Sequence, residues 1–492
     1  MYGLSKRKLL LLSASRSCLL ASPAWAADDA QIQSLQSQMK ALQAQIDELK
    51  AQRQAPAVAA QSAPAAAPAP QVLGSNKPAI AYETPSHQFG LTSADGANSI
   101  EITGRIQFDV GAYPGYKAAE GVGPFGVGKG PQDGVNLRRG RVGVVGKFLD
   151  DFNYALIYDF GGSTDATPAT GIENAFVTYN GWNKQANTVP VAVDFGYLDV
   201  PFTLDESVSS NDIMFMERSS AQAAAVSFGG SDARSAFGLR SYRPRYWLGA
   251  YVTGPTAGTA HTGQQNSAIA YIGRATYQVV QTDNASLHLG VNLDYSKPSK
   301  GNATAGTISL SDRPEFRIDS TTTLNTGTIQ EKNASVVGAE LAAGFQNFYT
   351  QAEFYHMTLS QWTNGTNSFG GANATSPDLT FDGGYLEASY SIGGRRKYNP
   401  SSGAYTGVIP DQPYSMSTGG MGAFEIAARF SALNLNDHLP AGGKTFASTG
   451  GIGGGDQKAY TFGVNWYANN NVRLMLDYVH ADINQWDCPE PC

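Results

Sequence analysis

Two neighbouring stretches, residues 137–148 and 152–160, alternate apolar and polar side chains with a period of two. The first places Arg139, Arg141 and Lys147 on one face and small or apolar residues on the other. The second is apolar or aromatic at every other position, and a short turn joins the two stretches. This pattern predicts an antiparallel hairpin with one apolar face and one polar, basic face. Such a hairpin fits a soluble sandwich with its polar face outside, or a membrane barrel with its polar face around a water-filled lumen.

The composition favours the membrane barrel. Of the 492 residues, 55 are Gly, 24 are Tyr and 22 are Phe, and 15% are charged, whereas soluble domains carry about 25% charged residues. The sequence has no apolar run of about 18 residues, so we expect no membrane-spanning helix, while alternating strands leave no such run. The net charge of −7 argues against nucleic acid as a partner.

The alternation repeats from residue 98 to the end and predicts fifteen strands. They cover residues 99–112, 137–148, 152–160, 172–180, 191–198, 234–242, 245–253, 269–278, 287–295, 336–345, 348–357, 385–392, 423–430, 460–467 and 472–479. Short turns such as 346–347 alternate with long Gly-, Ser- and Thr-rich loops such as 296–332, which is typical of outer-membrane proteins. We therefore expect an all-β fold, a transmembrane antiparallel β-barrel over residues 98–492.

Single-chain bacterial barrels have an even number of strands, so about 16 are expected here. Residues 483–492, INQWDCPEPC, lack the apolar and aromatic alternation of a membrane strand. We therefore expect that truncation or a frameshift has removed a closing strand from this sequence. The alternative is a strand that the alternation does not reveal.

The N-terminal residues predict three further segments. A basic start, an apolar run and an Ala-Trp-Ala cleavage site predict a signal peptide over residues 1–26. Residues 27–53 carry apolar residues at alternating spacings of three and four, which predicts a coiled coil in the periplasm. An Ala- and Pro-rich linker follows over residues 54–97.

Strand parity divides the charged side chains that would face the lumen into two walls. The basic wall comprises Arg105, Arg139, Arg141, Lys147, Arg234, Arg240 and Arg274. The acidic wall comprises Asp294, Glu340, Glu353, Glu387, Glu425 and Asp477. This asymmetry predicts a transverse field that orients dipolar solutes, and a modest anion preference from Arg139, Arg141 and Lys147. The corresponding function is passive diffusion of small hydrophilic solutes.

Seven segments between residues 85 and 480 carry a further signal: LRRGRVGVVGKFLDDFNYALIYDF, IENAFVTY, FGYLDVPFTLDESVSSNDIMFMERS, VVGAELAA, GGYLEASYSIGGRRKY, GAFEIAARFSALNLND and FGVNWYANNNVRLMLDYVH. In this order they resemble the phosphate-selective porin O and P family. The resemblance implies a trimeric, sixteen-stranded outer-membrane channel that prefers anions such as phosphate, and many members carry an N-terminal coiled coil.

The resemblance also implies that the third external loop, at about residues 199–232, folds into the lumen as a constriction. The constriction residues expected here are Asp199, Pro201, Phe202, Asp205, Glu206 and Glu217, with Arg218 as the one base of the loop. Selection of an oxyanion needs clustered Arg and Lys donors. This acidic loop therefore leaves a general or sugar-type porin without phosphate selectivity as an alternative.

Two other functions remain for a barrel of this kind. A barrel lipase would need a nucleophile, a His and a carboxamide on the lipid face, but His356 has the position of an interface residue there. The sequence shows no nucleophile elbow and no His spacing for a metal, so we expect no enzyme, metal or cofactor. The other alternative is a structural barrel that tethers the envelope through contact of its coiled coil with peptidoglycan. For the porin we expect a homotrimer in the lipid of the outer membrane of a Gram-negative bacterium.

Overall fold

The computed structural model divides the chain into two units, Met1–Gly74 and Ser75–Cys492. It describes residues 40, 43–44, 78–84, 88–115, 131–161, 171–184, 190–228, 233–255, 268–297, 306–362, 366–369, 371–372, 376–442 and 444–485. In the first unit, Lys40, Gln43 and Ala44 are helical and exposed. The predicted signal peptide, the remainder of the predicted coiled coil and the linker up to residue 77 lie outside the described residues.

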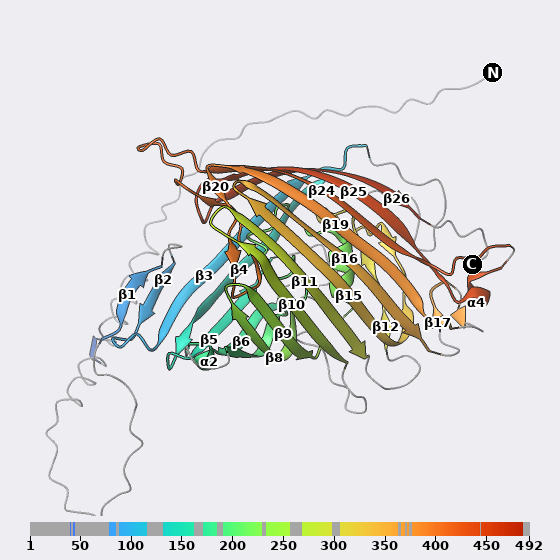
Figure 1. Cartoon of the computed structure of the whole chain (residues 1–492), viewed down its shortest axis with the longest axis horizontal. Coiled ribbons are helices and arrows are strands. Elements are labelled where there is room, and N and C mark those ends of the chain that lie inside the picture. The colour runs from blue at the N-terminus through green and yellow to red at the C-terminus, as the bar shows by residue number, and fades with distance from the viewer. Residues whose placement is uncertain are drawn as a thin grey trace, which may run out of the picture. The chain divides into compact units, whose positions relative to one another are not determined.

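The second unit is built on one antiparallel sheet of 20 strands, and all fifteen predicted strands are confirmed (Figure 1). The long strands are β3 (Ser99–Gly111), β4 (Gly134–Phe148), β5 (Phe152–Asp159), β6 (Gly171–Tyr179), β7 (Val191–Asp199), β8 (Ala233–Arg243), β9 (Tyr246–Thr253), β10 (Ile269–Gln281), β11 (Ala285–Lys297), β15 (Ile329–Phe345), β16 (Phe348–Gln361), β19 (Leu379–Ile392), β24 (Ala423–Asp437), β25 (Ile452–Tyr467) and β26 (Arg473–Asn484). Each long strand pairs with the next long strand along the chain, from β3 to β26, so the sheet is a continuous meander.

Short elements lie in the connections between long strands and in the residues before β3. They are β1 (Ile80–Glu83), β2 (Phe89–Thr92), α2 (Gly181–Lys184), α3 (Ser220–Ser227), β12 (Thr307–Ile308), β13 (Ser311–Asp312), β14 (Leu324–Asn325), β17 (Thr366–Asn367), β18 (Gly371–Ala372), β20 (Gly394–Arg395), β21 (Tyr398–Asn399), β22 (Ala404–Tyr405), β23 (Ile409–Pro410) and α4 (Phe446–Thr449). In the part of the chain that the structure describes, no helix is long and apolar enough to cross a membrane.

The two faces of the sheet differ as the period-two pattern predicts. Outward side chains are apolar and exposed, for example Ile106 at 83% and Leu476 at 72%. Inward side chains include buried charged residues such as Arg274, Glu340 and Glu425. A continuous exposed apolar surface of this extent is a surface for lipid or for another protein.

The two ends of the sheet differ in the length of their connections. Short turns, such as residues 149–151, 244–245 and 346–347, join strands at one end, and long segments join them at the other. Residues 393–422 are an exception, because they form a long segment at the short-turn end. At the short-turn end, the side-chain amide of Asn347 donates to the carbonyl of Ser391 at 2.9 Å and so links the turn before β16 to the last residues of β19.

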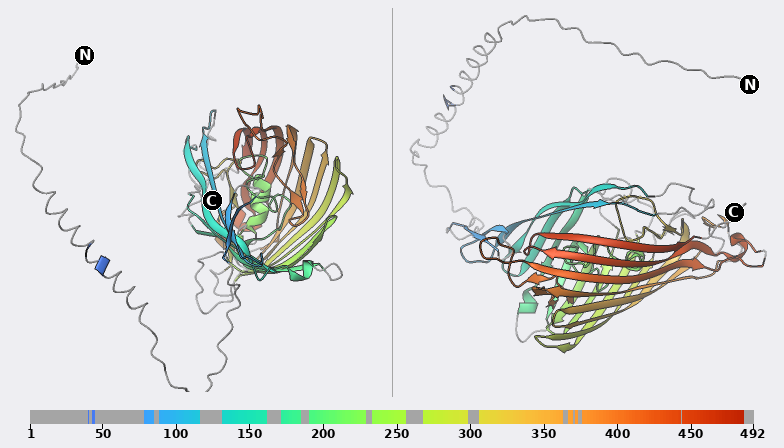
Figure 2. Two further views of the ribbon diagram at one scale, coloured as in Figure 1. Left: turned by 90° about the vertical axis from the view of Figure 1, so that its left-hand side faces the viewer. Right: turned by 90° about the horizontal axis from the view of Figure 1, so that it is seen from above.

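The inside of the sheet is filled rather than open. Residues 200–228 with α3 and residues 306–328 enter from the long-loop end, and Figure 2 shows the sheet curling round α3. The largest apolar core lies between these segments and the inner face, with Phe202, Trp247 and Tyr355 nearly inaccessible.

The first and last long strands have different neighbours from the others. Within the described residues, β26 pairs with β25, and β3 pairs with β4 over its length and with β2 at Ser99–Glu101. The described residues contain no sixteenth long strand between β3 and β26.

The face assignment can be tested on β11. Val291, 58% exposed, lies midway along its apolar outward face, whereas Tyr295 lies near the end. We expect Val291→Arg to lower the free energy of unfolding by about 2–4 kcal/mol and Tyr295→Arg by about 0–1 kcal/mol, because a cation on the lipid face costs most at the bilayer midplane. Equilibrium unfolding from lipid vesicles measures both changes in the free energy of unfolding. Equal changes for the two substitutions would contradict the assignment of this face to the lipid.

Candidate functional site: a charged constriction inside the sheet

The segment 200–228 begins directly after β7 and turns inward because its apolar residues pack against the inner face. Val200, Phe202 and Leu204 are buried at 1% exposure or less. The segment ends in α3, whose first turn is capped by Ser219, since the backbone N–H of Gln222 donates to its hydroxyl oxygen at 3.2 Å. Inside the sheet, these contacts fix both ends of what we call the constriction segment, residues 200–228.

Glu353 of β16 anchors the start of the constriction segment. Its two carboxylate oxygens accept the backbone N–H groups of Leu204 at 2.8 Å and Asp205 at 2.9 Å. The Tyr385 hydroxyl of β19 donates to the same carboxylate at 2.7 Å. One inward side chain with these three hydrogen bonds therefore holds a turn that has no sheet partner.

The opposite wall holds the middle of the constriction segment through its backbone. Arg473 donates to the carbonyl of Ile213 at 2.8 Å, and Asn465 donates to the carbonyl of Met214 at 2.8 Å. The N–H of Met216 donates to Asp477 at 2.7 Å. The segment therefore crosses from β16 to β25 and β26.

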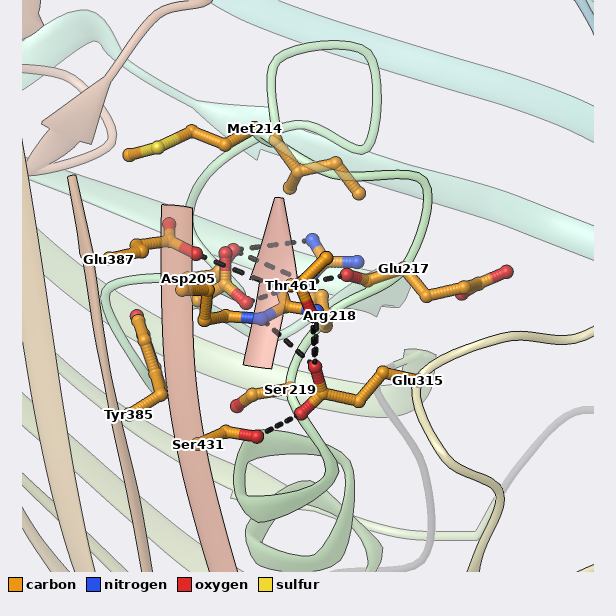
Figure 3. A network of polar contacts seen from close by, with 12 residues as sticks. Asp205, Met214, Glu217, Arg218, Ser219, Glu315, Tyr385, Glu387, Ser431 and Thr461 are labelled. Atoms are coloured by element: carbon orange, nitrogen blue, oxygen red, sulfur yellow. Dashed lines mark hydrogen bonds and ion pairs between the residues drawn. The ribbon is translucent and has the colours of Figure 1, made fainter. Parts of the chain in front are cut away.

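Glu315 attaches the second inward segment, residues 306–328, to the sheet and to α3 (Figure 3). Its carboxylate accepts two hydrogen bonds from Arg429 at 2.6 and 3.0 Å, and one from the backbone N–H of Ser220 at 3.1 Å. The hydroxyl groups of Ser431 and Thr461 donate to it as well. Glu315 thus joins β24, β25 and α3 at one buried carboxylate.

The third inward segment is the long turn 393–422, which the sequence analysis did not anticipate. Arg396 forms a two-point ion pair with Glu425 of β24 at 2.8 and 2.9 Å, and donates to the carbonyl of Asp212 at 2.6 Å. On the other side, Arg274 of β10 donates to the carbonyls of Ser402 at 3.0 Å and Gly403 at 2.8 Å. The turn therefore meets the constriction segment from the opposite end of the sheet.

Five of the basic residues predicted to contact anions are paired with carboxylates in the structure. Arg141 pairs with Asp159 (2.7 Å) and Glu173 (2.5 Å), Lys147 with Asp150 (2.8 Å), Arg234 with Asp294 (3.3 Å), Arg240 with Asp194 (2.9 Å) and Arg274 with Glu340 (2.8 Å). The predicted transverse field between a basic and an acidic wall is therefore largely cancelled locally, and Asp159 and Asp194 come from the strand directly beside that of their arginine.

Arg218 and the predicted acidic residues mostly hold the constriction segment together. Arg218 donates to the carbonyls of Asp205 and Val208, and its guanidinium lies 3.7 Å from the carboxylates of Asp205 and Glu206. Burial raises the pKa of Asp205. The other predicted residues differ in exposure: Asp199 ends β7 and is exposed, Pro201 is half-buried and Phe202 is buried.

Arg105 and Arg139 have a different environment. Arg139 donates to the side-chain oxygen of Gln107 at 2.6 Å, and Arg105 donates to the Ser210 hydroxyl at 2.5 Å. The buried Nε atom of each guanidinium has no hydrogen-bond partner among the described residues. Both partners are neutral, so these two arginines keep both charge and donor capacity at the face of β3 and β4 that meets Ser210.

Sequence parity missed Arg138, which faces inward next to Arg139. The register between β3 and β4 shifts at this point, from Gln107↔Arg139 to Phe108↔Leu137, so Arg138 is the extra residue of a β-bulge. Arg138 pairs with Glu217 at 2.5 and 3.1 Å. Burial opposes ionisation of Glu217, but Arg138 and Arg317 outweigh it and hold the pKa of this carboxyl at about 2.

An antiparallel sheet with an apolar outer face and an interior crossed by charged loops defines an outer-membrane diffusion channel. The chain belongs to the phosphate-selective porin O and P family, whose model matches residues 100–486. It is therefore an outer-membrane porin of a Gram-negative bacterium, a channel and not an enzyme.

Two curated relatives and two solved structures are similar to the chain. Porin O of Pseudomonas aeruginosa is 24% identical over 410 residues, which cover 80% of this chain and 85% of that protein. An uncharacterized protein of Caulobacter vibrioides is 27% identical over 495 residues, covering 96% of this chain and 89% of that protein. A loop-deletion mutant of OmpT of Vibrio cholerae has a TM-score of 0.43 at 11% identity, and the match covers 80% of this chain and 96% of that protein. The outer membrane channel DcaP of Acinetobacter baumannii has a TM-score of 0.42 at 14% identity, and the match covers 80% of this chain and 94% of that protein.

Removal of the Glu353 anchor should widen the lumen. We expect Glu353→Ala to raise the single-channel conductance and the current noise, because two backbone N–H groups lose their acceptor and each buried donor left without a partner costs about 1–3 kcal/mol. Planar-bilayer recording measures both. Glu331→Gln is the matched control, since Glu331 is an inward, buried carboxylate of β15 whose Oε2 bonds to none of the described residues. An unchanged conductance in folded Glu353→Ala would contradict the anchor role.

The Glu217 pairing gives a pH prediction with a defined sign. Its pKa is lowered from 4.5 to about 2, so the stabilisation from its pairing is present above the unfolded pKa and is lost as pH falls through about 2. Glu217 should stay ionised from about pH 8 to about pH 5, so we expect its titration to cause no change in the current noise of the wild type over this range. Glu217→Gln should show, at neutral pH, the noise that the wild type shows near pH 2. A Glu217-dependent transition near neutral pH would contradict this assignment.

Proposed function

We propose that this porin conducts small hydrophilic solutes and prefers anions, phosphate among them, at a site formed by Arg105 and Arg139. The observation that carries the proposal is that the hydrogen-bond partners of both guanidiniums are neutral rather than acidic. Family membership supports a channel of this class.

The chemistry of the pair suits a tetrahedral oxyanion. Guanidinium groups bind such oxygens through charge-assisted, often two-point hydrogen bonds. Gln107 lies between the two arginines, since its amide donates to the carbonyl of Ser210 at 3.3 Å while its oxygen accepts from Arg139. The hydroxyl groups of Ser209 and Ser210 lie against Arg105 at 3.4 and 2.5 Å and offer further neutral donors. An anion entering here would exchange hydration for these donors at the edge of the constriction segment.

The second candidate is a general or sugar-type porin without phosphate selectivity. It is favoured by the carboxylate pairing of Arg141, Arg234, Arg240 and Arg274, because a compensated cation attracts a passing anion weakly. The two candidates differ in whether the remaining basic pair changes ion selectivity.

Further parts of the proposal rest on the family and on the sequence. We propose a homotrimer surrounded by outer-membrane lipid, with the coiled coil of residues 27–53 in the periplasm, where it contacts the cell wall. The mass of the detergent-solubilised complex tests the subunit number. Deletion of residues 27–53 tests whether the coiled coil supports assembly or envelope integrity rather than conductance.

Arg105→Gln and Arg139→Gln test the anion site. We expect each to move the zero-current potential across a potassium chloride gradient toward potassium, and to weaken phosphate inhibition of the chloride current about tenfold, as the loss of one charged hydrogen bond implies. Lys147→Gln is the control, because Lys147 pairs with Asp150 at the short-turn end. No shift in the arginine variants, or an equal shift in Lys147→Gln, would favour the general porin.

A further inference from the structure

A hairpin without any charged side chain protrudes from the short-turn end of the sheet. Turns at the same end, such as residues 346–347 and 469–471, consist of polar residues. By contrast, residues 412–421 in the last part of the long turn 393–422 read QPYSMSTGGM, and no charged residue follows before Glu425. We call residues 412–421 the uncharged hairpin.

Backbone contacts define the form of the uncharged hairpin. Ser415 and Gly420 pair across it, with the N–H of Ser415 donating to the carbonyl of Gly420 at 3.0 Å. Gly419 has a φ of 72°, in the left-handed region that favours glycine, and lies in the turn between them. The N–H of Tyr414 donates to the carbonyl of Ala468, just beyond β25, at 2.6 Å. The sheet therefore holds the base of the hairpin, and the Ser415–Gly420 pair joins its two arms.

The base of the uncharged hairpin packs on the outward side of β25. The Tyr414 ring meets the indole of Trp466 edge-on, with ring centroids 5.3 Å apart. The indole N–H of Trp466 donates to the carbonyl of Met421 at 2.8 Å. On its other side, Trp466 stacks on Phe424 of β24 with centroids 6.2 Å apart. The hairpin thus begins among outward aromatic side chains.

These aromatic side chains mark a level of the membrane. Near the short-turn end, Phe348 of β16, Tyr390 of β19 and Phe424 of β24 are outward and 45%, 54% and 37% exposed. Aromatic residues in this position form the girdle where the hydrocarbon of the bilayer meets the head groups. The contact with Trp466 therefore places the base of the uncharged hairpin at the bilayer interface.

Two methionines extend the apolar surface beyond the girdle. Met416 at the tip of the hairpin is 90% exposed, and Met421 at its base is 63% exposed. An apolar side chain gains free energy when it leaves water. A charged side chain would oppose transfer toward hydrocarbon, and the hairpin has none.

We infer that the uncharged hairpin lies in the lipid interface at the short-turn end, with its two methionines against acyl chains and Tyr414 at the level of the head groups. The occupant follows from continuity, because the hairpin starts at Trp466 in the aromatic girdle and prolongs the lipid-facing surface. The long turn 393–422 is then held on both sides of the barrel wall: in the lumen through the Arg396–Glu425 pair, and outside it through the bilayer. This inference does not depend on the anion site.

Methionine oxidation of the wild-type porin in liposomes tests whether the tip leaves water. A water-soluble oxidant should modify a freely exposed methionine as fast as it modifies N-acetylmethionine amide in the same suspension. We expect Met416 and Met421 to be oxidised about fivefold more slowly, since partial burial of a methionine side chain favours the lipid by roughly this factor. Mass spectrometry of the peptides measures both rates.

A fluorescent label identifies what covers the tip. Met416→Cys is labelled with bimane in a porin that carries Cys488→Ser and Cys492→Ser and has lost its predicted signal peptide, which holds the third cysteine. The liposomes contain a lipid with a nitroxide near its head group. We expect the label to lose as much emission as one at Tyr390→Cys in the girdle. Asn470→Cys, in the polar turn between β25 and β26 at the same end, should lose much less.

The outcomes separate lipid from other occupants. Oxidation of Met416 as fast as the free amide, or equal quenching at positions 416 and 470, would overturn the inference. Slow oxidation without quenching by the lipid nitroxide would show that a second copy or another protein covers the tip, which also overturns it. The oxidation experiment uses the wild type, so its result does not depend on the folding of a variant.

Discussion

Inward-facing carboxylates and guanidiniums satisfy the backbone of three segments that have almost no regular structure of their own, and the form of the lumen depends on them. A buried N–H or C=O group without a partner costs about as much as a lost hydrogen bond. Glu353 accepts two N–H groups of the constriction segment, while Arg473 and Arg274 donate to carbonyls of residues 213 and 402–403. The charged wall therefore does for these segments what a neighbouring strand does elsewhere in the sheet.

The same pairing limits what the charges can do for a passing solute. Removal of one partner of a buried ion pair leaves an uncompensated charge and costs about 3–5 kcal/mol. Pairs such as Arg274–Glu340 and Arg429–Glu315 are almost inaccessible and are tied to their segments by further hydrogen bonds. We infer that these pairs fix the segments in place, and that a solute experiences mainly the charges of inward side chains that are not in such ion pairs.

Much of the fold could be predicted from the sequence because its signal is local. Apolar and polar residues alternate within each strand, so both the fifteen strands and the inward side of Arg234 or Glu340 follow from counting. The bulge at Arg138 could not be predicted this way, since one extra residue reverses parity without changing composition. The pairing of Glu315 with Arg429, and the inward course of residues 393–422, depend on contacts between residues more than 100 positions apart or on the choice of a turn's side.

Neutral partners explain why Arg105 and Arg139 differ from the inward arginines that are paired with carboxylates. An arginine paired with a carboxylate presents almost no net charge to a solute at a distance. An arginine bound to an amide or a hydroxyl group uses one of its N–H donors but keeps its full charge. Gln107 and Ser210 orient the two guanidiniums as a carboxylate would, yet leave the charge uncompensated. The adjacent Arg138 makes the direct ion pair with Glu217, a buried acid of the constriction segment, so the hydrogen bond of Arg139 goes to Gln107 instead. The bulge thus places two arginines side by side with separate tasks: one binds the segment, and the other remains available for an anion.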